Sequence, residues 1–449
     1  HFSHIERVRG SGCMMIRRHY SLLLCCLGSL APDAHGREAS QQPFGHSLLP
    51  QFLFAEGYTN LNHGSFGAPP RLVIENMHAW QLKMEEKPDH WFRYNGPETL
   101  FGELDVVRAR LAKYIKAKSS KDVVFVDNAS GGMNAVLRSI RLPSNASVLI
   151  LNTVYKMVAE TIKYVHQHDK QEGPVQVNIT IPSTNDDIVA RVEDTLRANP
   201  SIKLASFSHI TSSPAIILPV RDLVRVCHER GVMVVIDGAH ALGQIPIDVQ
   251  DIGADFYVAN GHKWLYSPQG SAILWAAADK QHLLQPNIIS NEGLGATPFQ
   301  QQFSYTGTKD YSPFLAMGAA LDFRERVLGG DAAIMSYMHQ LAAQGGQILA
   351  KAWGTEKLVD DEFIGAMVNV RLPDTALACC DLDGLSARVY SEYNTWVPAI
   401  EWAGNCYMRV SAQVYNELSD FEMLARAVLQ TLKTGCTPGE KENGAALSV

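Results

Sequence analysis

Seven short apolar runs of strand length recur between residues 123 and 274, and helical stretches separate most of them. The runs occupy residues 123–126, 148–151, 175–181, 203–209, 232–236, 256–259 and 271–274. In one intervening stretch, Met133, Val136, Leu137 and Ile140 have the i, i+3, i+4, i+7 spacing of one helix face. Alternation of strands and helices over about 150 residues predicts an α/β fold, with a mostly parallel sheet and helices on both of its faces.

The pattern changes after about residue 313. A long helical region is expected to residue 352, followed by a strand at Met367–Leu372, another helix and a strand at Met408–Ser411. This order predicts a smaller α+β domain, joined by residues from the extreme N-terminus. The 449 residues allow one large and one small domain. The predicted division is a leader at 1–43, a large domain with an N-terminal arm at 44–312, a small domain at 313–434 and a frayed tail at 435–449.

Composition excludes several classes of protein. Hydrophobic residues make up 46% and charged residues 19%, so disorder or a coiled coil over the whole chain is excluded. A formal net charge of −7 argues against a nucleic-acid binder, which is normally basic. No apolar run reaches the ~20 residues that a membrane-spanning helix needs. We therefore expect neither nucleic acid nor a membrane as a partner.

Residues 14–34 have the order of features typical of a secretory leader: basic residues, a short apolar stretch and then small residues. The alternative is a disordered or mistranslated leader on a cytosolic protein, and both interpretations stay open. The cysteines beyond residue 200 are scattered and lack C-x-x-C spacing, which is typical of buried thiols in a reducing compartment. A cytoplasmic location is therefore favoured, with secretory or organellar targeting as the alternative.

Polar residues follow several of the predicted strands, at the ends where open α/β sheets bind ligands. Asp237 and His240 come after the fifth run, and Asn260, His262 and Lys263 come after the sixth. A glycine-rich stretch, D-N-A-S-G-G, follows the first run and opens a helix. We expect these groups to converge at one rim of the sheet.

Each of these features also has an ordinary structural explanation. An aspartate after a strand is often a helix cap, a lone lysine is usually solvated, and a Gly-Gly pair can be a tight turn. No dinucleotide- or triphosphate-binding glycine motif is present. His240 and His262 have no further carboxylate or cysteine at ligand spacing, so no metal site is predicted. Their placement at successive strand ends nevertheless favours one shared site.

This combination of residue types suits pyridoxal phosphate (PLP). The cofactor needs a lysine whose amine is made nucleophilic by a lowered pKa. It also needs a carboxylate beside its pyridine nitrogen, and a helix N-terminus whose free N–H groups bind its phosphate. Lys263, Asp237 and the helix start at residues 129–131 supply one of each.

Four stretches between residues 44 and 433 form a pattern that covers most of the chain. They are residues 44–67, which include N-L-N-H-G-S-F-G, residues 234–265, which include D-G-A-H and G-H-K-W-L, residues 304–314 and residues 408–422. The pattern resembles class V aminotransferase-superfamily enzymes of PLP fold type I. Among these, it is most similar to the isopenicillin N epimerase-like branch, which includes cysteine desulfhydrases and hercynylcysteine sulfoxide lyases. The resemblance implies a seven-stranded, mostly parallel sheet in a large PLP-binding domain.

The resemblance also implies roles around the cofactor. Lys263 matches the lysine that forms the Schiff base, Asp237 the partner of the pyridine nitrogen, and His240 the residue that hydrogen-bonds the phenolic oxygen. The residues implied to bind the phosphate are Ser130, Gly131, Asn260 and His262, with the asparagine standing where many relatives have serine. Thr308 resembles a threonine that reaches the cofactor of the partner subunit, which implies a homodimer.

Further matches concern the substrate and the catalytic step. Tyr155 matches an aromatic residue over the cofactor ring and is implied to be catalytic, while Ser212 lies where relatives place a residue near the ring. Arg409 matches the arginine that forks onto the substrate α-carboxylate. Asn62 and His63, from the N-H-G-S-F-G motif, are implied to bind substrate.

The leading hypothesis is a PLP-dependent lyase that removes the Cα proton of an amino acid and cleaves the C–S bond of a cysteine-derived substrate. A desulfurase that forms a persulfide is disfavoured because residues 390–397, where such enzymes carry a nucleophilic cysteine, contain none. Epimerisation of the isopenicillin N type is the alternative. A second alternative is a non-catalytic binding subunit, against which the intact set of Lys263, Asp237 and Arg409 argues.

Overall fold

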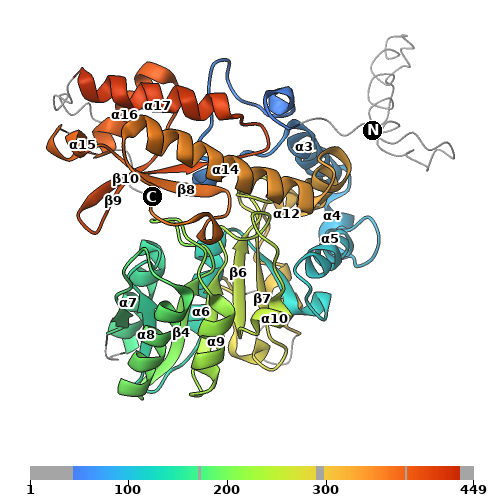
Figure 1. Ribbon diagram of the computed structural model, residues 1–449. Coiled ribbons are helices and arrows are strands. Elements are labelled where there is room, and N and C mark those ends of the chain that lie inside the picture. The colour runs from blue at the N-terminus through green and yellow to red at the C-terminus, as the bar shows by residue number, and fades with distance from the viewer. Residues whose placement is uncertain (1–43, 170–172, 290–297, 380–381, 435–449) are drawn as a thin grey trace, which may run out of the picture. The chain divides into compact units, whose positions relative to one another are not determined.

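The computed structural model describes residues 44–169, 173–289, 298–379 and 382–434 (Figure 1). Two β-sheets organise these residues, one of seven strands and one of three. The predicted leader at 1–43 and the predicted tail at 435–449 lie outside the described residues. None of the described helices is long and apolar enough to cross a membrane.

The larger sheet has the strand order β1-β7-β6-β5-β4-β2-β3. The pairs from β6 through β5, β4 and β2 to β3 are parallel, whereas β7 is antiparallel to both of its neighbours, β6 and β1. The bounds are β1 (Val123–Val126), β2 (Ser147–Leu151), β3 (Val175–Val177), β4 (Ile202–Ser208), β5 (Met233–Asp237), β6 (Phe256–Asn260) and β7 (Ala272–Ala276). The prediction of a mostly parallel, seven-stranded sheet is confirmed.

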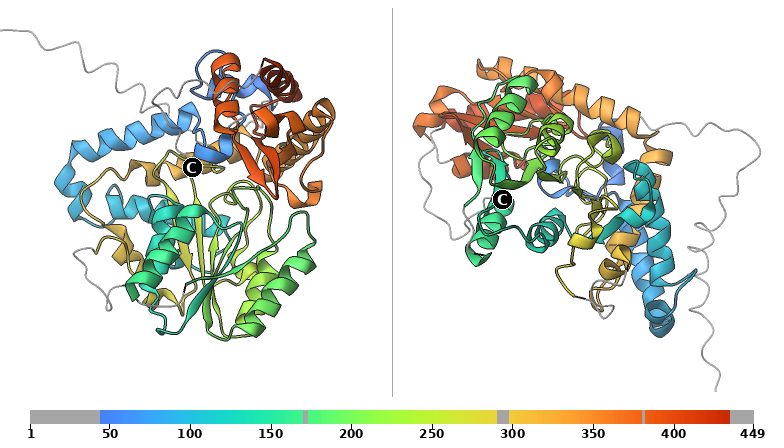
Figure 2. Two further views of the ribbon diagram at one scale, coloured as in Figure 1. Left: turned by 90° about the vertical axis from the view of Figure 1, so that its left-hand side faces the viewer. Right: turned by 90° about the horizontal axis from the view of Figure 1, so that it is seen from below.

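Successive side chains of the strands point to opposite faces, so the sheet has two buried layers. Val124 and Val235 belong to the core beneath α6 (Ala129–Ser139) and α7 (Lys156–Asp169). Val234 belongs to the core on the opposite face. The helices on that side include α5 (Leu100–Tyr114), α8 (Asn185–Ala198) and α9 (Val220–His228). Helices therefore flank the sheet on both sides, as predicted and as the left view of Figure 2 shows.

The third strand is shorter than the apolar run at 175–181 predicts. β3 ends at Val177, and beyond it the side chain of Asn152 takes over the pairing. The Asn152 amide donates to the Ile179 carbonyl at 3.1 Å and accepts from the Ile179 N–H at 3.0 Å. Because a side chain satisfies both backbone groups, the apolar run continues without a strand.

The smaller sheet has the order β8-β10-β9, with antiparallel pairs throughout. Its strands are β8 (Met367–Arg371), β9 (Ala399–Trp402) and β10 (Asn405–Ser411), of which β9 was not predicted. It packs with α14 (Asp331–Trp353) and α16 (Leu382–Tyr393), and α17 (Leu418–Lys433) packs on these two helices, all drawn in orange and red in Figure 1. A second, smaller α+β arrangement is therefore present, while its boundary at residue 312 stays a prediction.

The long helix expected from residue 313 to residue 352 is interrupted. Gly329 and Gly330 have φ angles of 82° and 95°, in the left-handed region, and they separate η4 (Phe323–Val327) from α14. Helical periodicity continues on both sides of this break, so the apolar pattern alone predicts one helix.

Residues at the start of the described chain pack against its end. The Gly45 N–H donates to the Val414 carbonyl at 2.7 Å, and the His46 ring lies 2.9 Å from the Asp420 carboxylate. The remaining elements are η1 (His46–Gln51), α2 (His63–Phe66), α3 (Arg71–Glu86), α4 (Pro88–Arg93), η2 (Ser120–Asp122), α10 (Val249–Ile252), η3 (Gln281–Leu283), α11 (Phe299–Ser304), α12 (Ser312–Leu315), α13 (Met317–Asp322), η4 (Phe323–Val327), η5 (Asp361–Phe363) and α15 (Asp374–Cys379).

Candidate active site

A cavity of about 200 Å³ lies at the carboxyl ends of β4, β5 and β6. Most of the predicted site residues line it, namely Ser130, Tyr155, Ser212, Asp237, His240, Asn260, His262 and Lys263. Those that do not line it are Asn62, His63, Gly131, Thr308 and Arg409. The polar residues at successive strand ends thus meet in one place, while their individual roles stay predictions.

Lys263 is the basic group at the centre of this cavity. Its Nζ lies 3.2 Å from Nε2 of His240, and Lys263 forms no ion pair within the described part of the chain. Burial and the charge of Arg409 lower the pKa of Lys263 to about 7, against the opposing effect of Asp237. A large fraction of the amine is therefore neutral near neutral pH, which makes it a nucleophile and a base.

Two buried side chains hold the backbone of the lysine turn from behind. His63 Nε2 donates to the Lys263 carbonyl at 2.8 Å, and Arg324 donates to the carbonyls of Trp264 and Gly243 at 2.8 and 2.9 Å. Gly243 has a φ of 88°, and a Cβ there would lie 2.5 Å from the Trp264 carbonyl oxygen. These contacts hold the turn after β6 against the loop after β5, and they fix the position of the Lys263 backbone.

His63 therefore lies in a different environment from the predicted substrate-binding one. The residue is fully buried, and its Nδ1 accepts from the Tyr415 hydroxyl at 3.0 Å. Burial lowers the pKa of His63 to about 4, so the ring is neutral. It supports the lysine turn and does not line the cavity, because its two ring nitrogens are held by the Lys263 carbonyl and the Tyr415 hydroxyl.

Asp237 supplies the buried carboxylate at the end of β5. One of its oxygens accepts from the Ala239 N–H at 3.0 Å. Burial raises the pKa of Asp237, while the Ala239 N–H and the charge of Lys263 oppose the shift. A cation against the carboxylate would stabilise its ionised form. The next residue is Gly238, and a larger residue would clash there, because a Cβ would lie 2.4 Å from the Tyr257 ring.

The start of α6 is capped more fully than the sequence suggested. The Asn128 side chain accepts from the Gly131 N–H at 2.8 Å, and the Asn260 side chain accepts from the Ala129 N–H at 2.7 Å. The Gly131 N–H and the Asn260 side chain are thus engaged in capping α6. Among the first three amides of α6, only the Ser130 N–H has no partner within the described residues.

His262 lines the same cavity as this helix start and has one ring nitrogen engaged. Its Nδ1 donates to the Ser271 carbonyl at 3.2 Å, and its Nε2 has no partner among the described residues. Burial and the charge of Lys263 lower the pKa of His262 to about 4. An anion between Ser130 and His262 would favour the charged imidazolium.

Arg409 lies directly behind the cavity wall on β10. Its Nη1 donates to the carbonyl and hydroxyl of Ser212 at 3.0 and 3.1 Å, and its Nη2 donates to Asn62 and Ser65 at 3.0 and 2.8 Å. Its Nε is buried without a hydrogen-bond partner, and no carboxylate pairs with it in the described chain. Burial lowers the pKa of Arg409 to about 10, with Tyr155 opposing the shift. The arginine is thus a buried cation without a counter-ion.

Tyr155 lies half-buried on the cavity wall, four residues beyond the end of β2. Burial raises the pKa of Tyr155, and the Asp237 charge adds to the shift while Arg409 opposes it. The hydroxyl is therefore protonated at neutral pH and is a candidate proton donor.

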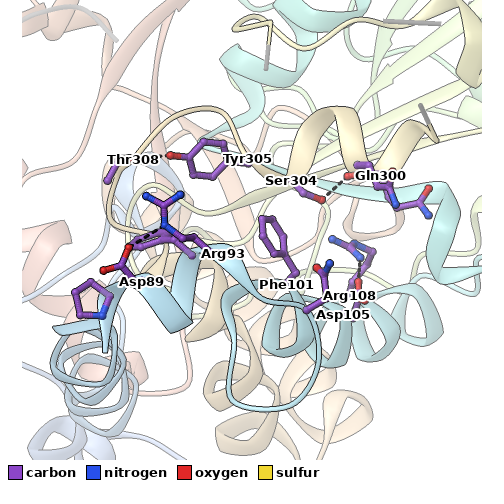
Figure 3. A pocket seen from close by; sticks show the side chains of 13 residues that line it. Asp89, Arg93, Phe101, Asp105, Arg108, Gln300, Ser304, Tyr305 and Thr308 are labelled. Atoms are coloured by element: carbon purple, nitrogen blue, oxygen red, sulfur yellow. Dashed lines mark hydrogen bonds and ion pairs between the residues drawn. The ribbon is translucent and has the colours of Figure 1, made fainter. Parts of the chain in front are cut away.

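Thr308 lies apart from the cavity, in a larger open pocket of about 650 Å³ (Figure 3). Its hydroxyl is 2.7 Å from that of Tyr305. The neighbouring Lys309 pairs with Asp127 at 2.5 Å, and Asp127 directly precedes the α6 cap. The loop after α11 is thus tied to the start of α6 in its own chain.

Several contributing residues were not predicted. Ser65 and Phe66 line the cavity beside the Arg409 contacts, and they belong to the N-H-G-S-F-G motif, so the motif was a usable signal. The Gln244 side chain donates to the His240 carbonyl at 2.6 Å and accepts from the Ala366 N–H at 2.7 Å. Arg324 and Gln244 carry no local signal, because their partners lie far away in the sequence.

Comparisons with known proteins agree with this geometry. A family model described as Aminotransferase class-V matches residues 98–382. The chain is 31% identical to the L-cysteine desulfhydrase-like protein lolT1 of Epichloe uncinata, over 86% of this chain and 95% of that protein. It is 29% identical to hercynylcysteine sulfoxide lyase of Schizosaccharomyces pombe, over 87% of this chain and 98% of that protein.

Solved structures support the same fold. The cysteine desulfurase CsdA of Escherichia coli superposes with a TM-score of 0.71 at 18% identity, over 87% of this chain and 99% of that one. At this identity the likeness shows the fold alone. Together with the family match, it confirms the resemblance inferred from the four sequence stretches.

Proposed function

The chain belongs to the class V aminotransferase family, and from this we propose that it is a PLP-dependent lyase that cleaves the C–S bond of a cysteine-derived amino acid. One observation carries the proposal: Asp237 and Arg409 are buried and Lys263 is partly buried, yet none of the three forms an ion pair among the described residues. Buried charges without partners are costly, so a ligand with complementary groups is expected between them.

PLP and an amino acid fit this set of groups. Asp237 would hold the proton on the ring nitrogen, Lys263 would bond the aldehyde carbon, and Ser130 with His262 would hold the phosphate. When bound, the cofactor supplies an electron sink for a carbon next to the amino nitrogen. The remaining buried cation, Arg409, has no role toward the cofactor and suits the substrate carboxylate.

The chain's own residues then divide the work. Arg409 would orient the carboxylate through its guanidinium, assisted by the hydroxyls of Ser65 and Ser212, which already contact it. Lys263, whose pKa is about 7, would take the proton from Cα. The protonated hydroxyl of Tyr155 would donate a proton to the departing sulfur.

The described cysteines support release of sulfur to solution over its transfer to the protein. Cys227 and Cys406 are both buried, and neither lines the cavity. Burial raises the pKa of both thiols, which disfavours the nucleophilic thiolate. Unpaired buried thiols also agree with the proposed cytoplasmic location.

We also propose a homodimer in which Thr308 reaches the cofactor of the partner subunit. Its support is that Thr308 faces an open pocket of its own chain and not its own cavity (Figure 3). The oligomeric state, measured by light scattering, tests this part independently of the chemistry.

The main test is reconstitution with PLP, followed by spectroscopy and a substrate panel. The wild type should gain a visible absorbance band, and Lys263→Ala should lack it and lose turnover by ~10⁴-fold or more. The matched control is Lys203→Ala, a change at an exposed lysine of β4, which should keep the band. A wild type that stays colourless would overturn the proposal.

The panel distinguishes the lyase from the epimerase. It contains cysteine, cystine, S-substituted cysteine sulfoxides and amino acids without sulfur, and it follows pyruvate release and loss of α-deuterium in parallel. Pyruvate release together with loss of α-deuterium from the sulfur-containing substrates supports the lyase. Loss of deuterium without pyruvate would instead assign the protein to epimerisation.

A further inference from the structure

The two ring nitrogens of His240 face different partners. Its Nδ1 lies 3.4 Å from the indole Nε1 of Trp264, which donates to it. Its Nε2 lies 3.2 Å from Nζ of Lys263. Both His240 and Trp264 are buried, and neither ring nitrogen has another hydrogen-bond partner in the described ranges.

The indole contact decides where the histidine carries its proton. An indole N–H is only a donor, so His240 Nδ1 must offer its lone pair to Trp264. In a neutral imidazole the proton is then on Nε2. His240 is neutral because burial and the charges of Lys263, Arg409 and His262 hold its pKa well below the usual range.

An N–H at Nε2 in turn affects the charge of Lys263. A neutral amine has a lone pair that accepts from Nε2–H, whereas an ammonium group has only donors and would face another donor. The contact is therefore favourable only for the neutral amine. The Arg409 charge acts in the same direction, and Asp237 opposes both.

We propose that Trp264 is a positioning residue for Lys263. Its indole N–H holds His240 in the tautomer protonated on Nε2, and this tautomer favours the neutral, nucleophilic lysine amine. The inference rests on the proposed function in taking Lys263 as the group that bonds the cofactor. The contacts themselves belong to the protein alone, so they can be tested without cofactor.

The first experiment measures the pKa of Lys263 in the apoprotein. The readout is the pH dependence of its acetylation by acetic anhydride, followed by mass spectrometry of the peptide that contains it. In Trp264→Phe, which keeps a ring and loses the N–H, we expect the pKa of Lys263 to rise by about one unit and labelling at pH 7 to fall roughly fivefold. An unchanged pKa in a folded Trp264→Phe protein would overturn the proposal.

The matched control is Trp275→Phe. Trp275 is a buried tryptophan of β7 whose Nε1 has no hydrogen-bond partner in the described chain, so this change removes an indole N–H away from His240. It should leave the pKa of Lys263 unchanged. An equal rise in both variants would overturn the proposal, because it would reflect general loosening of the core.

A double variant tests whether Trp264 acts through His240. Phenylalanine in place of His240 keeps a ring but has no nitrogen to accept from Trp264 or to donate to Lys263, so in His240→Phe the further change Trp264→Phe should not raise the pKa of Lys263. Asp237, Arg409 and His262 face the lysine in every variant, and their contributions cancel in the comparison. A further rise in the double variant would show that Trp264 acts by another route and would overturn the proposal.

A direct measurement on the wild type covers the case in which Trp264→Phe does not fold. Nitrogen-15 NMR of histidine-labelled apoprotein reports which ring nitrogen is protonated, and loss of one signal in His240→Gln assigns it. Protonation on Nε2 supports the proposal, and protonation on Nδ1 overturns it. Failure to bind PLP would overturn the proposed function, whereas this test uses the apoprotein and would still be valid.

Discussion

The pocket of Figure 3 is the larger of the two hollows discussed above, and its charges are already satisfied. Asp89 pairs with Arg93 at 2.8 Å, and Asp105 pairs with Arg108. The first pair is exposed to solvent, and its side chains are 83% and 75% accessible. Exposed, paired charges gain little from a ligand.

The smaller cavity and the wall directly behind it hold the same kinds of side chain in the opposite state. Asp237 and Arg409 are buried, Lys263 is partly buried, and none of the three has an ion pair among the described residues. A ligand whose charges complement these groups offsets the free-energy cost of holding them away from water without a partner, so its binding stabilises the folded protein. Burial without a partner, and not volume, therefore identifies the reactive site.

The sharpest test of this difference is Tyr155→Phe, which removes one hydroxyl from the cavity. If Tyr155 donates a proton to the leaving group, turnover should fall by ~10²–10⁴-fold with an unchanged absorbance band. Tyr164→Phe, at an exposed tyrosine of α7, is the control and should keep full activity. If Tyr155→Phe turns over every substrate as fast as the wild type, the tyrosine is only a wall of the cavity.

A matched pair of aspartate variants comes next. Asp237→Asn should retain PLP, because Lys263 and the phosphate site are unchanged, but lose turnover by ~10²–10³-fold, since an amide cannot stabilise a cationic ring nitrogen. Asp89→Asn makes the same chemical change in the larger pocket and should leave steady-state kinetics unchanged. Near-normal turnover in Asp237→Asn would show that its role is misassigned.

Burial also predicts a pH dependence of stability. Burial lowers the pKa of His63 and His209 to about 4 from an ordinary value of 6.5. Between these values the unfolded chain binds protons that the folded protein excludes. The free energy of unfolding should therefore fall as pH drops through this window, by roughly 3 kcal/mol per histidine.

Urea unfolding of the apoprotein across this pH range measures the effect, and His209→Gln should remove its share of the slope. A flat profile between the two pKa values would contradict the burial of these rings in a neutral state.

The smallest expected effect is that of Arg93→Ala in the larger pocket. The Arg93 guanidinium pairs with Asp89 in full contact with solvent, so the urea midpoint and turnover should both stay as in the wild type. A clear loss of activity would show that this pocket takes part in the reaction and would break the contrast between the two regions.

Much of the larger sheet was predictable because its strands are buried on both faces and read as continuous apolar runs. All seven runs became strands, and Asp237 and Lys263 lie near strand ends as expected. The misses have local causes. β9 has a mixed burial pattern without a clear period, and β3 is cut short by the Asn152 side chain.

Residue types and spacing along the chain determined the α/β fold, the family and the set of groups at the strand ends, because strand and helix periods and motif order are local properties. Only the tertiary structure decided which of those groups face the cavity. In the folded chain His63 lies behind the lysine turn and Asn260 caps α6. Arg324 contacts the lysine turn, and Trp264 contacts His240 in the loop after β5. Such contacts depend on side-chain direction between segments far apart in the chain, which no local pattern encodes.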